Sequence, residues 1–307
     1  MPARNEIQEE IYKAKATAQD QIRRKYIKNL SDYTHRDVIV YITAYTTIKM
    51  MNVPPNLVAI QDNDIHGFMS ALHGLKSDNL DLVIHSPGGS AETTIQIVNY
   101  LRKKYKHIRV IIPQSGMSAA TMLACASNEI IMSKHSAIGP IDPQITFPTP
   151  SGLFTAPAHS LIKEFEKAKE EILKNRDIAP LWIKKFENLP HGILDICKNS
   201  IELSKETVIQ WLTSFMFENE VDAQEKAKTI GEWLGNPDNH KSHGKPIPYD
   251  DPDLKFLKIK LLEDDQELQE HVLSVFHSSI LTIEVTNCIK IIENQNGNGL
   301  YINFEKK

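Results

Sequence analysis

Residues 81–101, DLVIHSPGGSAETTIQIVNYL, and residues 108–132, IRVIIPQSGMSAATMLACASNEIIM, decide the fold of this 307-residue chain. In each stretch an apolar run ends at a tight turn, and a segment with the apolar spacing of a helix follows it. Continuous apolar strands that alternate with helices predict parallel βαβ units with both faces of the sheet covered. The fold class is therefore α/β. In such sheets the ligand site lies beyond the carboxyl ends of the strands, where these two turns would lie side by side.

The two turns carry residues suited to nucleophilic catalysis. Gly88 and Gly89 follow the first strand, accept backbone dihedrals that other residues avoid, and leave backbone N–H groups uncovered. Ser118 follows the second strand at the expected start of a helix, with the small residues Ala119 and Ala120 after it. This pattern predicts Ser118 as a nucleophile, with the N–H of Gly88 or Gly89 and that of Ala119 as an oxyanion hole. The alternative is that Ser118 is only a helix N-cap and that the glycines only shape a turn.

Three motifs together resemble one protein family. They are SPGG at residues 86–89, SAA at 118–120 and AIGPIDPQ at 137–144. They resemble the Clp/crotonase-fold serine proteinases, and most closely the serine dehydrogenase proteinases, which are related to signal peptide peptidases. The similarity runs from about residue 37 to residue 165 and more weakly to the C-terminus. It implies a Clp/crotonase-like spiral of βαβ units with helical extensions at both ends, a homo-oligomer, and ATP-independent hydrolysis of peptide bonds through Ser118.

The motifs leave the general base open. Clp-type enzymes place a histidine near residues 139–142, where this chain has none. Relatives of the signal peptide peptidase type use a lysine at the start of the next helix, and that pattern leads to His159, with Lys163 one helical turn later. A histidine accepts a proton at neutral pH, whereas a lysine first needs its pKa lowered by burial. The resemblance therefore makes His159 the first candidate, Lys163 the second and His135 the third.

Other polar residues near the motifs have ordinary structural explanations. His85 ends a strand, and Asp142, which precedes a proline, is expected to cap its own loop. His240 and His243 are three residues apart, but no carboxylate or cysteine cluster accompanies them, as a metal site would require. Asp142 has the alternative role of orienting a base or a substrate, and His85 ranks with His135 as the next candidate base. No catalytic role is predicted for His240 and His243, and neither a metal nor a cofactor is expected.

Composition limits the function classes. The net charge of −4 gives no reason to expect binding to nucleic acid. Three widely spaced cysteines, an odd number, indicate a reducing compartment. No apolar run is long enough for a membrane span, and the N-terminus lacks the apolar segment of a signal peptide. We therefore expect a cytoplasmic protein that acts on polypeptide substrates.

The chain is predicted to divide into an N-terminal helix (1–34), a catalytic domain (35–250) and a C-terminal helix with a β-hairpin (251–307). The charged N-terminal helix has an apolar stripe that needs a partner surface. The helices predicted between residues 159 and 233 have no obvious place on the core. Both features favour a homo-oligomer. Residues 145–158 and 236–251 are rich in loop-forming residues, and NGNG at 296–299 predicts the turn of the final hairpin.

Two other function classes use the same fold. A crotonase-like enzyme that acts on acyl-CoA needs no serine at position 118 and usually has a carboxylate near the second turn, whereas this chain has only the distant Glu129. A non-catalytic scaffold is favoured if neither His159 nor Lys163 reaches Ser118. Fold alone does not decide among the three, because function depends on the site.

Overall fold

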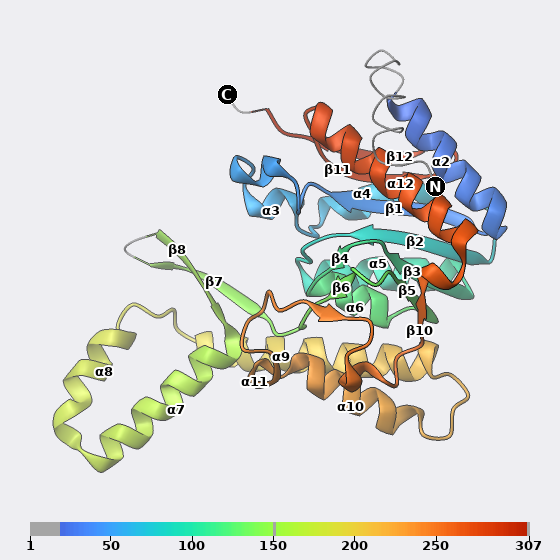
Figure 1. Ribbon diagram of the computed structural model, residues 1–307. Helices are drawn as coiled ribbons and strands as arrows, with labels where there is room; N and C mark the ends of the chain where they lie inside the picture. Colours follow the sequence, from blue (N-terminus) through green and yellow to red (C-terminus); the bar gives the residue numbers. More distant parts are fainter. Residues whose placement is uncertain (1–18, 150–151, 306–307) are drawn as a thin grey trace.

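The computed structural model describes residues 19–149 and 152–305 and confirms the α/β class. Within these residues a seven-stranded sheet has the order β10-β5-β3-β2-β1-β11-β12 (Figure 1). Its parallel strands are β1 (Asp37–Thr43), β2 (Asn79–His85), β3 (His107–Ile112), β5 (Glu129–Met132) and β10 (Ile259–Leu261). Strand β11 (Cys288–Asn294) runs antiparallel to β1, and β12 (Gly299–Asn303) runs antiparallel to β11.

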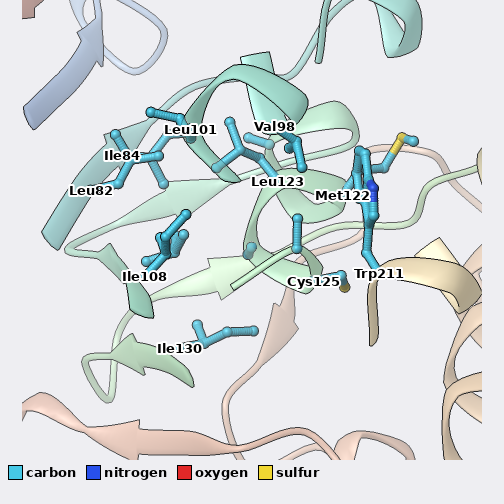
Figure 2. Close-up of a cluster of buried hydrophobic side chains, with 14 of the residues drawn as sticks. Leu82, Ile84, Val98, Leu101, Ile108, Met122, Leu123, Cys125, Ile130 and Trp211 are labelled. Atoms are coloured by element: carbon cyan, nitrogen blue, oxygen red, sulfur yellow. The ribbon is translucent and has the colours of Figure 1, made fainter. Parts of the chain in front are cut away.

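Helices cover both faces of this sheet. One face packs against α4 (Asn63–Leu72), α5 (Ala91–Lys104), α6 (Ala119–Cys125), α9 (Ile193–Trp211) and α10 (Ala223–Gly235). The other face packs against α2 (Gln19–Thr34) and α12 (Gln266–Val285). Leu82 and Ile84 belong to the first core, shown in Figure 2, and Val83 belongs to the second. Both cores exist because successive side chains of a buried strand point to opposite faces.

Of the helices for which the sequence offered no place, α9 and α10 lie against the first core. Val208 and Trp211 of α9 and Leu234 of α10 are buried in it. Because α9 and α10 are buried against this chain's own core, they do not support the prediction of an oligomer. Strands β10 and β11 place the last part of the chain inside the central sheet. The division of the chain at residues 34 and 250 stays a prediction, and the part of the predicted N-terminal helix before residue 19 lies outside the described residues.

The loop predicted over residues 145–158 is wrong, because its described residues form a hairpin. Strand β7 (Gln144–Thr149) pairs with β8 (Gly152–Pro157), and Phe147 lies opposite Phe154 with ring centroids 5.7 Å apart. Alternating Thr and Phe side chains favour strands and outweigh the prolines here. The hairpin, α7 (Ala158–Lys174) and α8 (Ala179–Phe186) extend away from the central sheet (Figure 1).

Short elements complete the region around the site. Strands β4 (Ser115–Gly116), β6 (Ala137–Ile138) and β9 (Ile247–Pro248) form a three-stranded sheet. Helices α3 (Pro55–Val58) and α11 (Pro237–His240) are single turns, and a π-helical turn spans Leu212–Met216. In the part of the chain that the structure describes, no helix has both the length and the apolar character to cross a membrane.

His85, at the end of β2, makes the stability of the fold depend on pH. It is fully buried and lies edge-on against Phe276, with its Nε2 3.0 Å from the Thr46 hydroxyl. Burial lowers its pKa to about 4, from about 6.5 in an unfolded chain. The unfolded state therefore binds more protons in this interval, so stability is complete above about pH 6.5 and falls toward pH 4.

We expect His85 alone to lower the free energy of unfolding by about 3 kcal/mol between pH 6.5 and pH 4. Urea denaturation at several pH values should show that His85→Gln removes this part of the pH dependence. The exposed His135 provides the control, since His135→Gln should leave the dependence unchanged. Equal pH dependence in the wild type and His85→Gln would contradict the prediction.

Candidate active site

Backbone hydrogen bonds bring the two predicted turns together. The N–H of Ser86 donates to the carbonyl of Ser115, and the N–H of Met117 donates to the carbonyl of Ser86, both at 3.0 Å. Gly88 consequently lies against the backbone of Ser118. A Cβ atom at Gly88 would be 2.5 Å from the Met117 carbonyl oxygen and 2.7 Å from Ser118 Cβ, and its φ is +94°. Glycine is required at this position by both space and conformation.

The second glycine is clamped by Ile60. The N–H of Ile60 donates to the Gly88 carbonyl at 2.7 Å, and the N–H of Ser90 donates to the Ile60 carbonyl at 3.0 Å. A Cβ atom at Gly89 would lie 2.3 Å from the Ile60 oxygen. The N–H of Gly88 already donates to the Ser86 hydroxyl at 3.1 Å. Of the two glycines, this bond favours Gly89 as the candidate oxyanion donor.

Ser118 has a strained backbone. Its φ of +52° and ψ of −119° lie in a region that L-residues rarely adopt, at a typical cost of about 1–3 kcal/mol. Such strain is stored at catalytic turns, as in the nucleophile elbow of hydrolases. Ser118 holds the N-cap position of α6, but its side chain makes no capping hydrogen bond. The simple N-cap explanation is therefore wrong.

A cavity of about 570 Å³ opens beside Ser118, at the carboxyl ends of the parallel strands. Its walls come from the glycine turn, α3, the hairpin β7–β8, α9 and the loop before β9. Apolar atoms of Ile141, Ile145 and Leu203 line it together with Gln144 and Ser204. A site of this size, with both apolar and polar side chains in its walls, fits a short segment of an extended chain.

His243 also lines this cavity, and its ring is held by Asp142. Strand β9 pairs antiparallel with β6, which brings the loop around His243 next to the GPIDPQ loop. The Nδ1 atom of His243 lies 2.8 Å from Oδ1 of Asp142, whose side chain is only 4% exposed. Gln144 donates to the other carboxylate oxygen at 2.9 Å. With Nδ1–H donating to the carboxylate, Nε2 is the free acceptor of the ring.

Neither predicted base lines this cavity among the residues that the structure describes. Lys163 donates to both carboxylate oxygens of Asp238 at 2.6 and 2.7 Å, and its side chain is 57% exposed. These hydrogen bonds lower the pKa of Asp238. His159 lies near the same carboxylate and also lowers the pKa of Asp238. Lys163 thus lacks the burial that a neutral lysine base needs, and the role of either residue in catalysis stays a prediction.

His135 and His240 lie outside the lining of the cavity beside Ser118. His135 is exposed and lines a different cavity of about 230 Å³ with Phe276. His240 lies 2.9 Å from the Trp233 carbonyl oxygen through Nε2, its ring stands edge-on to that of Trp233, and burial lowers its pKa. His240 therefore fixes the loop that presents His243. No group of three potential metal ligands occurs in residues 19–149 and 152–305.

The contact between His243 and Asp142 beside the cavity is the part that the sequence did not predict. The two residues are distant in sequence, and they meet only because two-residue strands pair. Such strands give no periodic signal. Glu129, the carboxylate considered for a crotonase-like enzyme, begins β5 and pairs with Lys260 at 2.6 Å. It does not line the cavity within the described residues, and the crotonase-like alternative is not favoured.

Comparison with known proteins gives a match over most of the chain. The sequence profile of the ClpP-like SDH-type serine proteinases matches residues 10–260. Two uncharacterised proteins of Methanocaldococcus jannaschii are similar. The first is 31% identical over 179 residues, which cover 56% of this chain and 59% of that protein. The second is 37% identical over 119 residues, 38% of each chain. The chain therefore spans less than two thirds of the curated relatives that it matches.

Two solved structures of the 1510-N membrane-bound stomatin-specific protease are also similar. A serine-to-alanine mutant is 15% identical with a TM-score of 0.38, covering 69% of this chain and 79% of that one. A lysine-to-alanine mutant in complex with a substrate peptide is 16% identical with a TM-score of 0.38, covering 80% and 84%. Both the TM-scores and the sequence identities are low, so these two structures assign no role to a residue of this chain.

Proposed function

The chain belongs to the ClpP-like SDH-type serine proteinases, and from that premise we propose that it is an ATP-independent serine peptidase. One observation carries the proposal: the strained Ser118 and the carboxylate-held His243 line the same cavity. In this assignment Ser118 is the nucleophile, His243 the general base and Asp142 the group that orients the base. The N–H groups of Gly89 and Ala119 form the oxyanion hole.

The roles follow from the chemistry of acyl transfer. Nε2 of His243 takes the proton of Ser118 as Oγ attacks the carbonyl carbon of the peptide bond. The carbonyl oxygen becomes negatively charged and receives hydrogen bonds from the two backbone N–H groups. His243 then gives its proton to the leaving amine. In the second half of the reaction His243 takes a proton from water as the water attacks the acyl group, and it returns the proton to Oγ of Ser118 as the acyl group leaves. Asp142 stays ionised and stabilises the imidazolium.

A fluorophosphonate probe tests the proposal. It reacts with an activated serine, and mass spectrometry of the labelled protein identifies the residue. We expect labelling at Ser118 alone. Labelling at Ser86 or Ser90, or none at all in a folded protein, would overturn the assignment.

His159 and Lys163 are the alternative bases, because they occupy the positions that the family pattern favours. For Lys163 this role requires that its ion pair with Asp238 open and that its side chain turn into the cavity. The observed contacts give His243 the advantage. Substitutions that separate the alternatives are described in the Discussion.

The glycine turn gives a prediction about turnover. Loss of one oxyanion donor typically lowers kcat by about 10²–10³-fold. A methyl group at Gly89 would collide with the Ile60 backbone, and one at Gly88 would collide with Met117 and Ser118. We therefore expect Gly88→Ala and Gly89→Ala to lower kcat by such factors through displacement of the turn, with a much smaller change in KM.

Gly74 provides the matched control for this prediction. Its φ of +76° imposes a similar backbone strain on alanine, but nothing lies within 4 Å of an added Cβ atom. Gly74→Ala should lower the melting temperature while kcat stays at the wild-type value. A folded Gly89→Ala enzyme with unchanged turnover would show that Gly89 is not a donor.

We also propose that the protein forms a homo-oligomer in the cytoplasm. Support for association comes from α7 and α8, whose exposed apolar side chains include Leu173, Leu181 and Ile183. Large exposed apolar patches mark interaction surfaces. Support for the compartment comes from three buried free cysteines.

Light scattering at micromolar concentration should give a multiple of the 34.8 kDa chain mass. Leu181→Glu, which places a charge on this surface, should reduce the mass. A monomeric wild-type protein would contradict the prediction of an oligomer. An unchanged oligomer in the variant would place the interface elsewhere.

A further inference from the structure

A buried ion pair that the chemistry above does not use lies beside the glycine turn. Lys290 of β11 and Asp64 of α4 are 1% and 0% exposed, and the Lys290 ammonium donates to both carboxylate oxygens at 2.8 and 2.9 Å. Tyr41 of β1 donates its hydroxyl to the same carboxylate at 2.7 Å. Burying two charges is costly, so a buried ion pair is weak support for stability and suggests another role.

The same ion pair holds the segment that clamps the glycine turn. The Lys290 ammonium also donates to the Ala59 carbonyl at 2.6 Å. Asp64 accepts the N–H of Gln61 at 3.0 Å. Ala59 and Gln61 are the two neighbours of Ile60, whose backbone hydrogen bonds fix the glycine turn. Ala59 itself lines the cavity.

Tyr41 provides a second connection. Burial and the Asp64 carboxylate raise its pKa, so the phenol keeps the proton that it donates to Asp64. The Ser86 side chain lies near enough to Tyr41 to offset part of this rise in pKa, and its hydroxyl accepts the N–H of Gly88 at 3.1 Å. The cluster therefore contacts the glycine turn from two sides, through the segment around Ile60 and through Ser86.

We propose that Lys290, Asp64 and Tyr41 are positioning residues for the oxyanion hole. This inference rests on the proposed function of Ser118. A donor must be held within about 0.5 Å of its productive position, and a displacement of about 1 Å can cost 10²-fold in rate. The buried bonds from Lys290 to Ala59 and from Asp64 to Gln61 hold Ile60, whose backbone fixes the glycine turn, and so supply this constraint.

The rate of fluorophosphonate labelling at Ser118 tests this inference without a known substrate. Its maximal rate constant reports the chemical step, and the probe concentration at half-maximal rate reports binding. We expect Lys290→Met to lower the maximal rate constant about tenfold or more, with half-saturation changed less than about twofold. Tyr41→Phe, which keeps the ring and removes only the hydroxyl, should lower the rate constant several-fold.

A double variant separates positioning from stability. Lys290→Met leaves the Asp64 carboxylate buried without its cation, which destabilises the fold. Adding Asp64→Asn removes that charge, so the melting temperature should recover. The bonds that hold Ala59 remain absent, so the labelling rate should stay low. Recovery of the rate together with the melting temperature would overturn the proposal.

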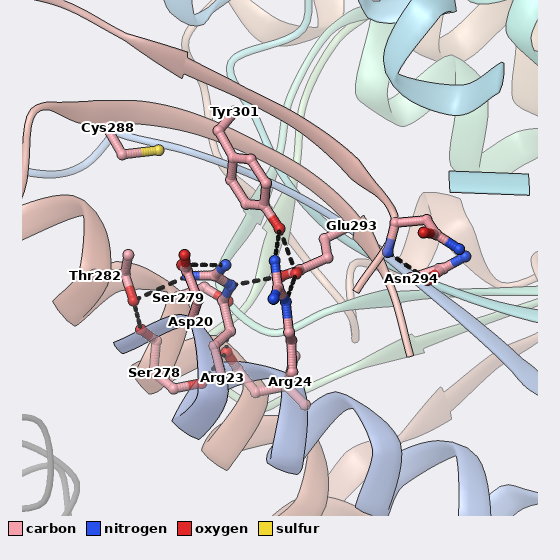
Figure 3. Close-up of polar contacts among 12 residues, drawn as sticks. Asp20, Arg23, Arg24, Ser278, Ser279, Thr282, Cys288, Glu293, Asn294 and Tyr301 are labelled. Atoms are coloured by element: carbon pink, nitrogen blue, oxygen red, sulfur yellow. Dashed lines mark hydrogen bonds and ion pairs between the residues drawn. The ribbon is translucent and has the colours of Figure 1, made fainter. Parts of the chain in front are cut away.

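A matched control lies on the same strand. Arg23 of α2 and Glu293 of β11, both drawn in Figure 3, form another fully buried ion pair, at 2.7 Å. Within the described residues, the other side-chain hydrogen bonds of Arg23 go to Thr282 and Asp20, and none goes to the segment around Ile60. Arg23→Met should lower the melting temperature and leave the labelling rate of the folded protein unchanged. Equal losses of rate in Lys290→Met and Arg23→Met would assign Lys290 a general structural role and refute the inference. Absence of labelling at Ser118 in the wild type would instead refute the proposed function.

Discussion

Replacing Ser118 by alanine is expected to lower peptide hydrolysis by about 10⁶-fold, the cost typical for loss of a catalytic serine that acts together with its base. The substitution removes the Oγ atom that attacks the peptide bond. It should leave the fold intact, because the Ser118 side chain makes no capping hydrogen bond and alanine tolerates the same dihedrals no worse. Hydrolysis of labelled casein and the melting temperature measure the two effects.

Ser127, two residues after the end of α6, gives the control for this prediction. Its hydroxyl donates to the Ala124 carbonyl and does not line the cavity. Ser127→Ala should change stability slightly and keep full activity. Activity that survives in Ser118→Ala at the level of the control would exclude Ser118 as the nucleophile.

Replacing His243 by alanine is expected to cost about as much as replacing Ser118, because the two act as one unit. Asp142→Asn should lower kcat by about 10⁴-fold, since an amide favours the wrong tautomer of the histidine ring. The double variant Ser118→Ala/His243→Ala should be no slower than either single variant. Steady-state hydrolysis of the same casein substrate gives all four rates.

The alternative bases are tested in the same series. His159→Ala and Lys163→Ala should keep activity within about tenfold of the wild type, because surface substitutions disturb a remote site little. His240→Ala controls for the loop, since it should lower stability more than it lowers the rate of the folded enzyme. A large loss in Lys163→Ala together with an active His243→Ala would transfer the base to Lys163.

The sequence predicted the parts of the site that depend on local pattern. Strands β2 and β3, the glycine turn and Ser118 lie in continuous stretches whose apolar periodicity and turn residues are unambiguous. The final hairpin was predicted for the same reason, from NGNG between two apolar runs. These signals need no knowledge of distant contacts.

The missed features depend on long-range pairing. His243 reaches Asp142 through β6 and β9, which have two residues each. Strand β10 has three residues and joins the edge of the sheet at β5, which no pattern within it reveals. The hairpin β7–β8 was predicted as a loop because its prolines and Thr residues carried more weight than the alternation of its Phe side chains. In each case pairing with a distant partner determines the strand.

The position of β11 has a consequence for biosynthesis. This strand lies between β1 and β12, yet the ribosome delivers it after all the parallel strands. Until then the hydrogen-bonding edge of β1 stays open, and an open edge invites pairing with other chains. The ammonium of Lys290 arrives with the same strand and supplies the cation that pairs with the buried Asp64 carboxylate. In a nascent chain Ser118 is therefore synthesised long before Lys290, so under the inference above the glycine turn lacks its brace until β11 has been made.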